Sequence, residues 1–494
     1  MLKIGWASAD VSTNARVTIT GQAHERISTG SMDPTTITAL YLEDGGDYVV
    51  FISGDFTGIE GQFLREVKAA AEAKIPGFDG SKIIFNATHT HTAPRYFLKT
   101  GYDKAPRDRL NIEPPEVYRA FLLEQVVNTV AKAWNGAASG SVAFGFGTAT
   151  VGISRRSTYF TDKGAGNVKG DTFAVNGHGV MYGKTNDPDF AGYEGSADND
   201  VNLLFTFDAQ NNLTGALVNV PCPSQCTEHE SFTSADYWNE ARAMIRQKYG
   251  DIFILPQCAA AGDLSPHLLH NLAARARRVK LCYGDDPKAA KFSRPEEYYN
   301  RLYIAEKLAR AFDEGYSWAQ NEKLTEMPIR HVSKAVALER WKVTEQQYIE
   351  AKENYAELMA GSFLCTDDPE ADFKANSRRS SEITRCESVI ARYENPAPTQ
   401  QTQIHVLKLG DVAFASCPFE LYIDFQHRIQ ARSPFTQTFF VQLASSEVGA
   451  GGYLATERAA ANKGYSAISF SCNVSPEGGQ TMVEEILKTM EEIR

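Results

Sequence analysis

The sequence lacks long hydrophobic runs. No stretch of its 494 residues approaches the roughly 18 consecutive apolar residues that a membrane-spanning helix needs. The N-terminal residues also lack the basic segment and apolar core of a secretory signal. We therefore expect no membrane span and no export signal.

Excess basic charge is missing as well. The chain has 50 Lys and Arg against 61 Asp and Glu, which gives a net charge of −11. The short basic cluster at 275–280 is more typical of one helix face than of a nucleic-acid-binding surface. The eight cysteines are scattered, which favours free thiols in a reducing cytoplasm. We expect a cytoplasmic protein with a small-molecule substrate and no nucleic-acid partner. The oligomeric state is left open, and a homo-oligomer is compatible with the sequence.

Strand-like and helix-like segments follow one another along the chain. Apolar spacing predicts helices at 62–74, 115–135, 234–247, 296–315, 344–360, 382–393 and 479–493, and strands at 82–85, 141–152, 202–207, 215–220, 402–409 and 412–416. Residues 155–197, rich in Gly, Asp and Asn, are predicted to form a long functional loop. No internal repeat or hinge divides the chain, so we predict one large α/β domain over residues 1–494.

The most informative segment is Asn86–Pro94, which contains His89 and His91 directly after a predicted strand. On an extended backbone, residues i and i+2 point to the same face, so both imidazoles would reach one small volume. Histidine is a frequent metal ligand and general base, but it is also a common hydrogen-bonding residue in loops. The pair alone leaves metal chemistry and a structural role equally open.

Other polar segments also follow predicted strands. Active sites of α/β proteins gather at such strand ends. The segments are Ser53–Asp55, Ser154–Arg156, Pro221–His229, Ala261–Pro266 and Ser416–Glu420.

Taken in order, several of these motifs resemble the catalytic domain of the neutral, non-lysosomal ceramidases. The motifs are Gly5–Asp10, Ser53–Asp55, Asn86–His91, Gly262–Pro266 and Pro418–Glu420. The resemblance extends from about residue 3 to residue 475. It implies layered mixed β-sheets flanked by helices, and a zinc ion that activates water to hydrolyse an N-acyl bond. The C-terminal immunoglobulin-like domain of that family has no counterpart in this sequence.

The resemblance also assigns roles to individual residues. It implies that His89 and Glu420 are zinc ligands and that His91 assists at the carbonyl. Ser265 matches a serine that acts as a nucleophile or positions the substrate, and Arg155 matches an arginine that contacts the substrate.

The sequence departs from the family pattern at two positions, so by resemblance it is a divergent member of the neutral ceramidase family. Cys222 stands where the family has its second histidine ligand, and a thiolate is a good zinc donor. The family's tyrosine ligand aligns with Ala450, and Tyr453 follows three residues later. We therefore expect His89, Cys222 and Glu420 as metal ligands. Tyr453 joins the expected catalytic residues, and Asp263 is expected to orient a ligand.

Simpler interpretations stay open for several of these residues. Cys222 fits a small buried hydrophobe, or a structural ion site with Cys226 and His229. Ser265 fits the cap of a helix that starts at Pro266. The carboxylate of Glu420 fits the N-terminus of a helix.

The leading hypothesis is a zinc-dependent, ceramidase-like amidase that acts on a soluble small molecule. One alternative is a metal-free or glycoside-cleaving hydrolase that uses Asp263, Glu228 and Glu420 as acid and base. Another is a binding protein that kept the fold and lost catalytic ligands.

Overall fold

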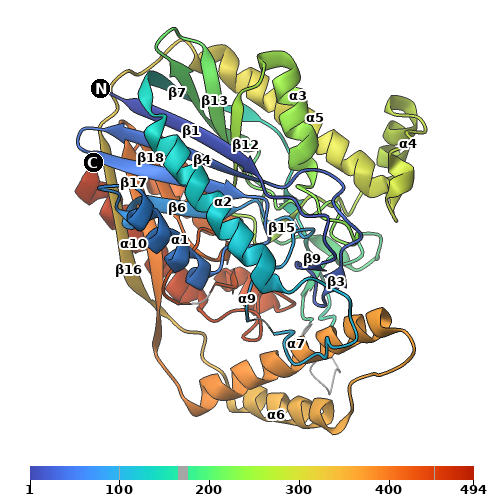
Figure 1. The fold of residues 1–494 in the computed structure, drawn as a ribbon. Coiled ribbons are helices and arrows are strands. Elements are labelled where there is room, and N and C mark those ends of the chain that lie inside the picture. The colour runs from blue at the N-terminus through green and yellow to red at the C-terminus, as the bar shows by residue number, and fades with distance from the viewer. Residues whose placement is uncertain (100, 165–175, 450) are drawn as a thin grey trace.

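The computed structural model describes residues 1–99, 101–164, 176–449 and 451–494 (Figure 1). Its centre is a large mixed sheet in which most neighbouring strands are antiparallel, whereas the pairs β5–β6 and β13–β14 are parallel. In spatial order the strands are β14 (Phe253–Cys258), β13 (Leu213–Val220), β12 (Asp200–Asp208), β7 (Ala138–Thr148), β1 (Lys3–Asp10), β4 (Thr36–Asp44), β5 (Asp47–Gly54) and β6 (Ile83–Ala87).

Long helices cover one face of this sheet. Because side chains alternate along a strand, Val50 and Ile52 of β5 face these helices while Val49 and Phe51 face the other way. The helices are α1 (Gly61–Lys74), α2 (Pro115–Asn135), α3 (Tyr237–Tyr249) and α5 (Pro295–Ala319).

A second sheet packs against the opposite face of the large one. Phe414 lies in this contact, with its ring centroid 5.0 Å from that of Phe51 and 4.2 Å from that of Phe439. The strands are β16 (Ile329–Glu339), β17 (Thr399–Leu409), β18 (Val412–Ser416) and β20 (Gln437–Val441). Its outer face is covered by α8 (Ile423–Arg432), α9 (Glu457–Asn462) and α10 (Pro476–Ile493). The order helix, sheet, sheet, helix confirms the predicted α/β class with layered mixed sheets.

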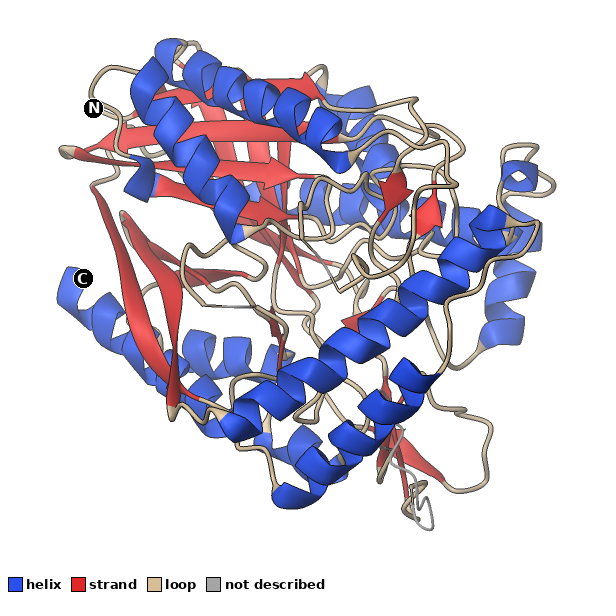
Figure 2. Ribbon diagram, turned by 60° about the horizontal axis from the view of Figure 1, so that its bottom comes forward, coloured by secondary structure: helices blue, strands red, loops and turns tan. Residues whose placement is uncertain are grey.

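The helices predicted at 62–74, 115–135 and 344–360 match α1, α2 and α6 (Glu345–Ala360) within one residue. The helix predicted at 382–393 is only the second half of α7 (Pro369–Glu394). Helices α6 and α7 pack together and extend diagonally across the molecule (Figure 2). Among the described residues, no helix is both long and apolar enough to span a membrane.

The prediction of one long loop at 155–197 is wrong. The structure forms a small sheet there from β9 (Arg156–Tyr159), β10 (Gly179–Met181) and β11 (Phe190–Tyr193), while residues 165–175 lie outside the described part. Strands of three or four residues are too short to produce a recognisable alternating pattern.

Short elements complete the fold around the ends of the main strands. The strand pairs are β2 (Thr18–Ile19) with β3 (Arg26–Ile27), β8 (Ile153–Ser154) with β15 (Leu264–Ser265), and β19 (Glu420–Leu421) with β21 (Tyr453–Leu454). The remaining helical pieces are η1 (Gly80–Lys82), η2 (Ala289–Lys291) and α4 (Leu272–Cys282).

Candidate active site

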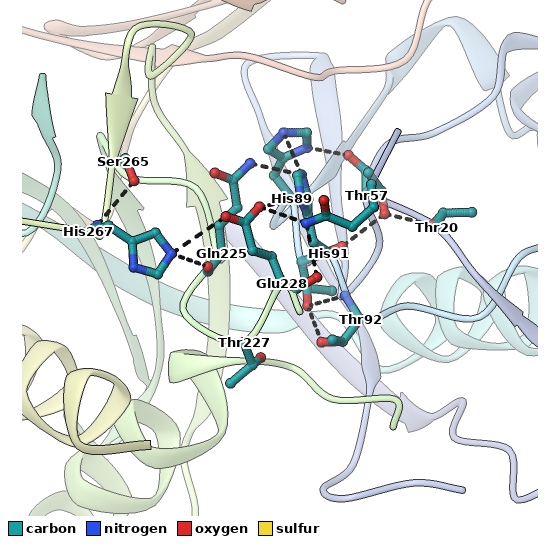
Figure 3. Close-up of polar contacts among 12 residues, drawn as sticks. Thr20, Thr57, His89, His91, Thr92, Gln225, Thr227, Glu228, Ser265 and His267 are labelled. Atoms are coloured by element: carbon teal, nitrogen blue, oxygen red, sulfur yellow. Dashed lines mark hydrogen bonds and ion pairs between the residues drawn. The ribbon is translucent and has the colours of Figure 1, made fainter. Parts of the chain in front are cut away.

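The two motif histidines lie together directly after β6 (Figure 3). Their ring centroids are 4.9 Å apart and their Nε2 atoms are 3.4 Å apart. The reason is not the extended backbone expected from the sequence, since His89 adopts a left-handed conformation with φ of 63°. The Nδ1 atom of His89 lies 2.5 Å from the carbonyl oxygen of Thr57. A carbonyl can only accept, so Nδ1 carries the proton and Nε2 of His89 presents a lone pair.

His91 is held by a carboxylate on one side and an amide on the other. Its Nδ1 donates to Oε2 of Glu228 at 3.2 Å, and Nε2 of Gln225 donates to His91 Nε2 at 2.8 Å. Burial lowers the pKa of His91, while the hydrogen bond to Glu228 raises it. Burial would raise the pKa of Glu228, but His91 and neighbouring histidines hold it at about 2. His91 is therefore a neutral imidazole whose tautomer is fixed by an ionised carboxylate.

The backbone of β2 and its turn fits closely around His91. Gly21 has φ of 111°, and a Cβ placed there would lie 2.5 Å from Cγ of His91. Only glycine fits this approach. Arg26, the first residue of β3, donates to the main-chain oxygen of His91.

Glu420 and Tyr453 lie opposite each other in the parallel strand pair β19–β21, which brings both residues to the site. Oε2 of Glu420 lies 3.3 Å from Nε2 of His89 and 3.8 Å from Nη2 of Arg155. Burial raises the pKa of Glu420, but its contact with His89 and the charge of Arg155 outweigh burial and lower the pKa to about 2. The carboxylate and the His89 lone pair are both acceptors, so a proton or a cation between them is needed to make this approach favourable.

Arg155 follows β8 and is fixed by the loop that precedes β15. Its Nη2 donates to the carbonyl oxygen of Gly262 at 2.8 Å and to the hydroxyl of Tyr453 at 3.1 Å. Its guanidinium also lies over the rings of Tyr182 and Tyr453, at 5.9 and 5.5 Å from their centroids. A Cβ at Gly262 would lie 2.3 Å from the carbonyl oxygen of Glu420, so glycine is required for this junction.

Ser265 lies beside the site without an activating base. Its hydroxyl oxygen accepts from the hydroxyl of Tyr182 at 3.3 Å and from the main-chain nitrogen of His267 at 3.1 Å. Within the described ranges, no histidine ring or carboxylate is hydrogen-bonded to it. No helix starts at Pro266, because α4 begins at Leu272, so the capping interpretation is wrong.

Asp263 also does not line the site. Its Oδ1 accepts from the main-chain nitrogen of Ile423 at 2.9 Å, and it contacts no histidine of the pair in the described structure. Burial raises the pKa of Asp263 to about 7. It joins β15 to the start of α8, which is a positioning contact for the segment that carries Glu420.

The structure does not bring Cys222 to the histidine pair. The thiol is 1 % exposed and packs in the core beneath α3, where Sγ donates to the carbonyl oxygen of Pro223 at 3.5 Å. Burial raises the pKa of Cys222 well above its usual range, so the thiol stays protonated. Cys226 is buried in the same core, whereas His229 is exposed. The structural-ion interpretation of these three residues is therefore not supported.

The described residues do not provide a complete set of ligands for the expected zinc ion. Catalytic zinc takes three protein ligands plus water, with donors at about 2.0–2.3 Å. The 3.3 Å between His89 Nε2 and Glu420 Oε2 suits two ligands of one ion. Over the described part of the chain, however, no group of three or more His, Cys, Asp and Glu side chains is arranged to hold a metal. Ala450 lies outside the described residues. The donors present thus do not fit a three-ligand zinc site.

Three neighbouring cavities surround these residues. The central cavity, of about 550 Å³, is bordered by His91, Arg155, Tyr182, Glu228, His267 and Tyr453 among others. The apolar cavity, of about 670 Å³, lies between α4 and α5 and is bordered by Leu268, Leu272, Val279, Tyr299 and Tyr303 with more polar neighbours. The basic cavity, of about 510 Å³, is bordered by His24, Arg26, His229, Arg294, Lys374 and others. The central cavity shares wall residues with each of the other two.

Sequence reasoning missed Gln225, Tyr182 and His267 and gave Glu228 only as an alternative acid. His267 lies 2.8 Å from the carbonyl oxygen of Gln225 and 3.7 Å from Oε1 of Glu228. The available signal was the polar segment after β13, which the sequence does single out. The residue predicted as a ligand in this segment, Cys222, lies three residues before Gln225.

Two solved structures that share this fold are ceramidases. The neutral ceramidase of Pseudomonas aeruginosa aligns with a TM-score of 0.64 over 99% of this chain and 75% of its own, at 19% identity. A ceramidase complexed with C2 aligns with a TM-score of 0.65 over 100% of this chain and 75% of its own, at 18% identity. Likeness at this identity establishes the fold. No family model and no curated protein matches the chain by sequence.

Proposed function

We propose that this protein is a hydrolase that cleaves an N-acyl bond, or a related carbonyl bond, in a small molecule. The observation that carries the proposal is the His91–Glu228 pair in the wall of the central cavity, which Arg155 and Tyr453 also border. A histidine fixed by a carboxylate is suited to move protons, and a cation with a hydroxyl is suited to stabilise an oxyanion.

The roles follow from which atoms can accept and donate. Water replaces the amide of Gln225 as the donor to His91 Nε2, which then takes a proton from this water as the water oxygen bonds to the carbonyl carbon. Arg155 and the hydroxyl of Tyr453 donate to the resulting oxyanion; this hydroxyl is free to donate because Arg155 donates to its oxygen. The protonated His91 then gives its proton to the leaving nitrogen as the C–N bond breaks. Glu228 stabilises the imidazolium throughout. The products are a carboxylic acid and an amine.

The resemblance predicts zinc, but no step above depends on it, because the donors in the described residues do not make up a three-ligand site. The donors this chain would offer are His89 Nε2 and Glu420 Oε2. Bound there, a zinc ion would act as a Lewis acid toward water or a carbonyl.

Of the three carboxyl groups named for glycoside cleavage, only Glu228 borders the central cavity. A glycosidase needs one carboxyl group that is protonated at working pH. The pKa values of Glu228 and Glu420 are both about 2, so neither can serve as that acid. Asp263 has a pKa of about 7 but does not border the central cavity. Glu297 borders this cavity and burial raises its pKa to about 8, so a glycosidase would have to use Glu297, which the sequence did not name. The adjoining apolar cavity offers a place for the acyl portion of the substrate.

A panel of N-dodecanoyl amides with different amine portions tests the proposal. We expect release of dodecanoate, followed by mass spectrometry, from at least one member of the panel. We expect the release to persist after dialysis against EDTA and to disappear in His91→Ala. No release from any member would contradict the hydrolase. Activity lost on chelation and restored by zinc would contradict the metal-free role of His91 and make His89 and Glu420 the ligands.

A further inference from the structure

The basic cavity lies next to the central cavity and shares Gln22, His229 and Arg294 with it. It is formed by the turn after β2, the start of α5 and the start of α7. A direct connection links it to the site, because Arg26 borders the basic cavity and donates to the main-chain oxygen of His91. Because the two cavities share wall residues, one molecule could extend from the basic cavity to His91.

The cations around this cavity are largely unpaired. Within the part of the chain that the structure describes, no hydrogen bond or ion pair is recorded for the side chains of His24, His229 or Lys374. Arg294 reaches Glu297 only at 3.8 Å. This is unusual in a protein with a net charge of −11.

The carboxylates that border the same cavity are already neutralised. The two oxygens of Glu25 accept from Arg95 at 2.7 Å and from Arg107 at 3.0 Å. Glu370 accepts from Arg16 at 2.5 Å. The charge that remains available to a ligand in this cavity is thus positive.

Arg26 adds a buried positive charge without a carboxylate contact. It is 6 % exposed, and its guanidinium donates to main-chain oxygens of Thr20, Glu230 and His91. Its Nε is buried and without a hydrogen-bond partner in the described structure. Burial lowers the pKa of Arg26 to about 10, although nearby glutamates oppose this.

The nearby cations also affect the pKa of His24. Burial together with the charges of Lys374, Arg26 and Arg378 lowers its pKa to about 4. At neutral pH, His24 is therefore an uncharged donor among fixed cations, which suits hydrogen bonding to an anion.

We propose that the basic cavity binds an anionic group of the substrate, such as a carboxylate, sulfonate or phosphate, while the scissile bond lies at His91. The proposal rests on the proposed function and names its substrate class, an N-acyl compound whose amine portion carries a negative charge. Lys374 and Arg294 supply the charge and His24 supplies a neutral donor. Polar recognition at the amine portion then complements the apolar cavity at the acyl portion.

A matched pair of probes tests this assignment. N-dodecanoylglycine carries a carboxylate where N-dodecanoylglycinamide carries a neutral amide of nearly the same size. Dissociation constants are measured by calorimetry in the His91→Ala background, so that neither probe is consumed. We expect the anionic probe to bind about 10-fold more tightly, because charge-assisted contacts are the stronger ones. Lys374→Glu should remove the difference. Lys488→Ala, an exposed lysine on α10, should leave it unchanged.

Equal affinity for the two probes, no binding of either, or a difference that survives Lys374→Glu would each overturn the proposal. Turnover of both probes by the wild-type chain separates this failure from failure of the proposed function. Hydrolysis at equal kcat/KM would uphold the hydrolase and reject the anion site. A charge-dependent difference in affinity without any hydrolysis would uphold the site and count against the hydrolase.

Discussion

Two buried histidine pairs in the described part of the chain have opposite surroundings. His89 and His91 lie at the end of β6, and each has a glutamate within 3.3 Å. His331 on β16 and His405 on β17 are also in contact, with 2.9 Å between Nε2 of the first and Nδ1 of the second. No carboxylate contacts the rings of this second pair in the described structure. Nδ1 of His331 and Nε2 of His405 are buried without hydrogen-bond partners.

The difference shows that burial alone does not make a histidine reactive. Burial lowers the pKa of His331 to about 4, and it lowers the pKa of His405 well below its usual range. Without a carboxylate to stabilise an imidazolium, these rings stay neutral and structural. His91 is buried as well, but Glu228 stabilises its charged form and the central cavity gives a ligand access to it. Partners and access distinguish the candidate site from the structural pair.

The largest expected effect separates the two pairs directly. His91→Ala should reduce hydrolysis by about 10²- to 10⁴-fold, which is the usual contribution of general acid–base catalysis. His405→Asn should leave kcat within about 3-fold and lower the thermal midpoint instead, because it disturbs a buried structural contact. Steady-state kinetics and thermal denaturation of both variants check this. Equal losses of activity would contradict the contrast.

A smaller effect is expected from the carboxylate behind His91. Glu228→Gln should lower kcat by on the order of 10²-fold, since the imidazolium loses its counter-charge while the hydrogen-bonding shape is largely kept. Glu230→Gln is the matched control. Glu230 lies two residues away and accepts from Ser293 at 2.7 and 2.8 Å rather than from His91. If both variants lose the same activity, the role assigned to Glu228 is wrong.

The smallest effect concerns stability in acid. A histidine with a lowered pKa in the folded state binds protons less readily than the unfolded chain does, so stability is present above pH 6.5 and falls below it. Between pH 7.5 and 5.5, His331 should lower the free energy of unfolding by about 1.4 kcal/mol. His405, whose pKa is also lowered, should likewise lower the free energy of unfolding as the pH falls. Urea unfolding at both pH values should show a smaller loss in His331→Asn. An identical loss in the variant would show that other groups cause the acid sensitivity.

Much of the fold could be predicted because its signals are local. Helix α2 was placed to the residue and α1 within one residue, since apolar residues repeat at helical spacing over several turns. The small sheet around β9 could not be placed, because its strands are short and gain their pairing from distant segments. The second half of α7 was found, and the polar first half was not.

The candidate site was predicted only in part. The sequence named His89, His91, Arg155, Glu420 and Tyr453, and the structure places them together. It also named Cys222 as a ligand, and the structure packs that thiol into the core while Gln225 and Glu228 face His91 from the same loop. Alignment to a family position cannot show which side chain of an irregular loop points inward.

What the sequence alone determined is most of the long helices, several strands of the two main sheets and the polar segments that follow strands, because periodicity and local turn chemistry depend on neighbouring residues. The tertiary structure alone decided which of those polar side chains meet. The register pair of Glu420 with Tyr453, the left-handed turn at His89 and the orientation of Cys222 all depend on packing between segments far apart in the chain. Those contacts also separate a reactive histidine pair from a structural one.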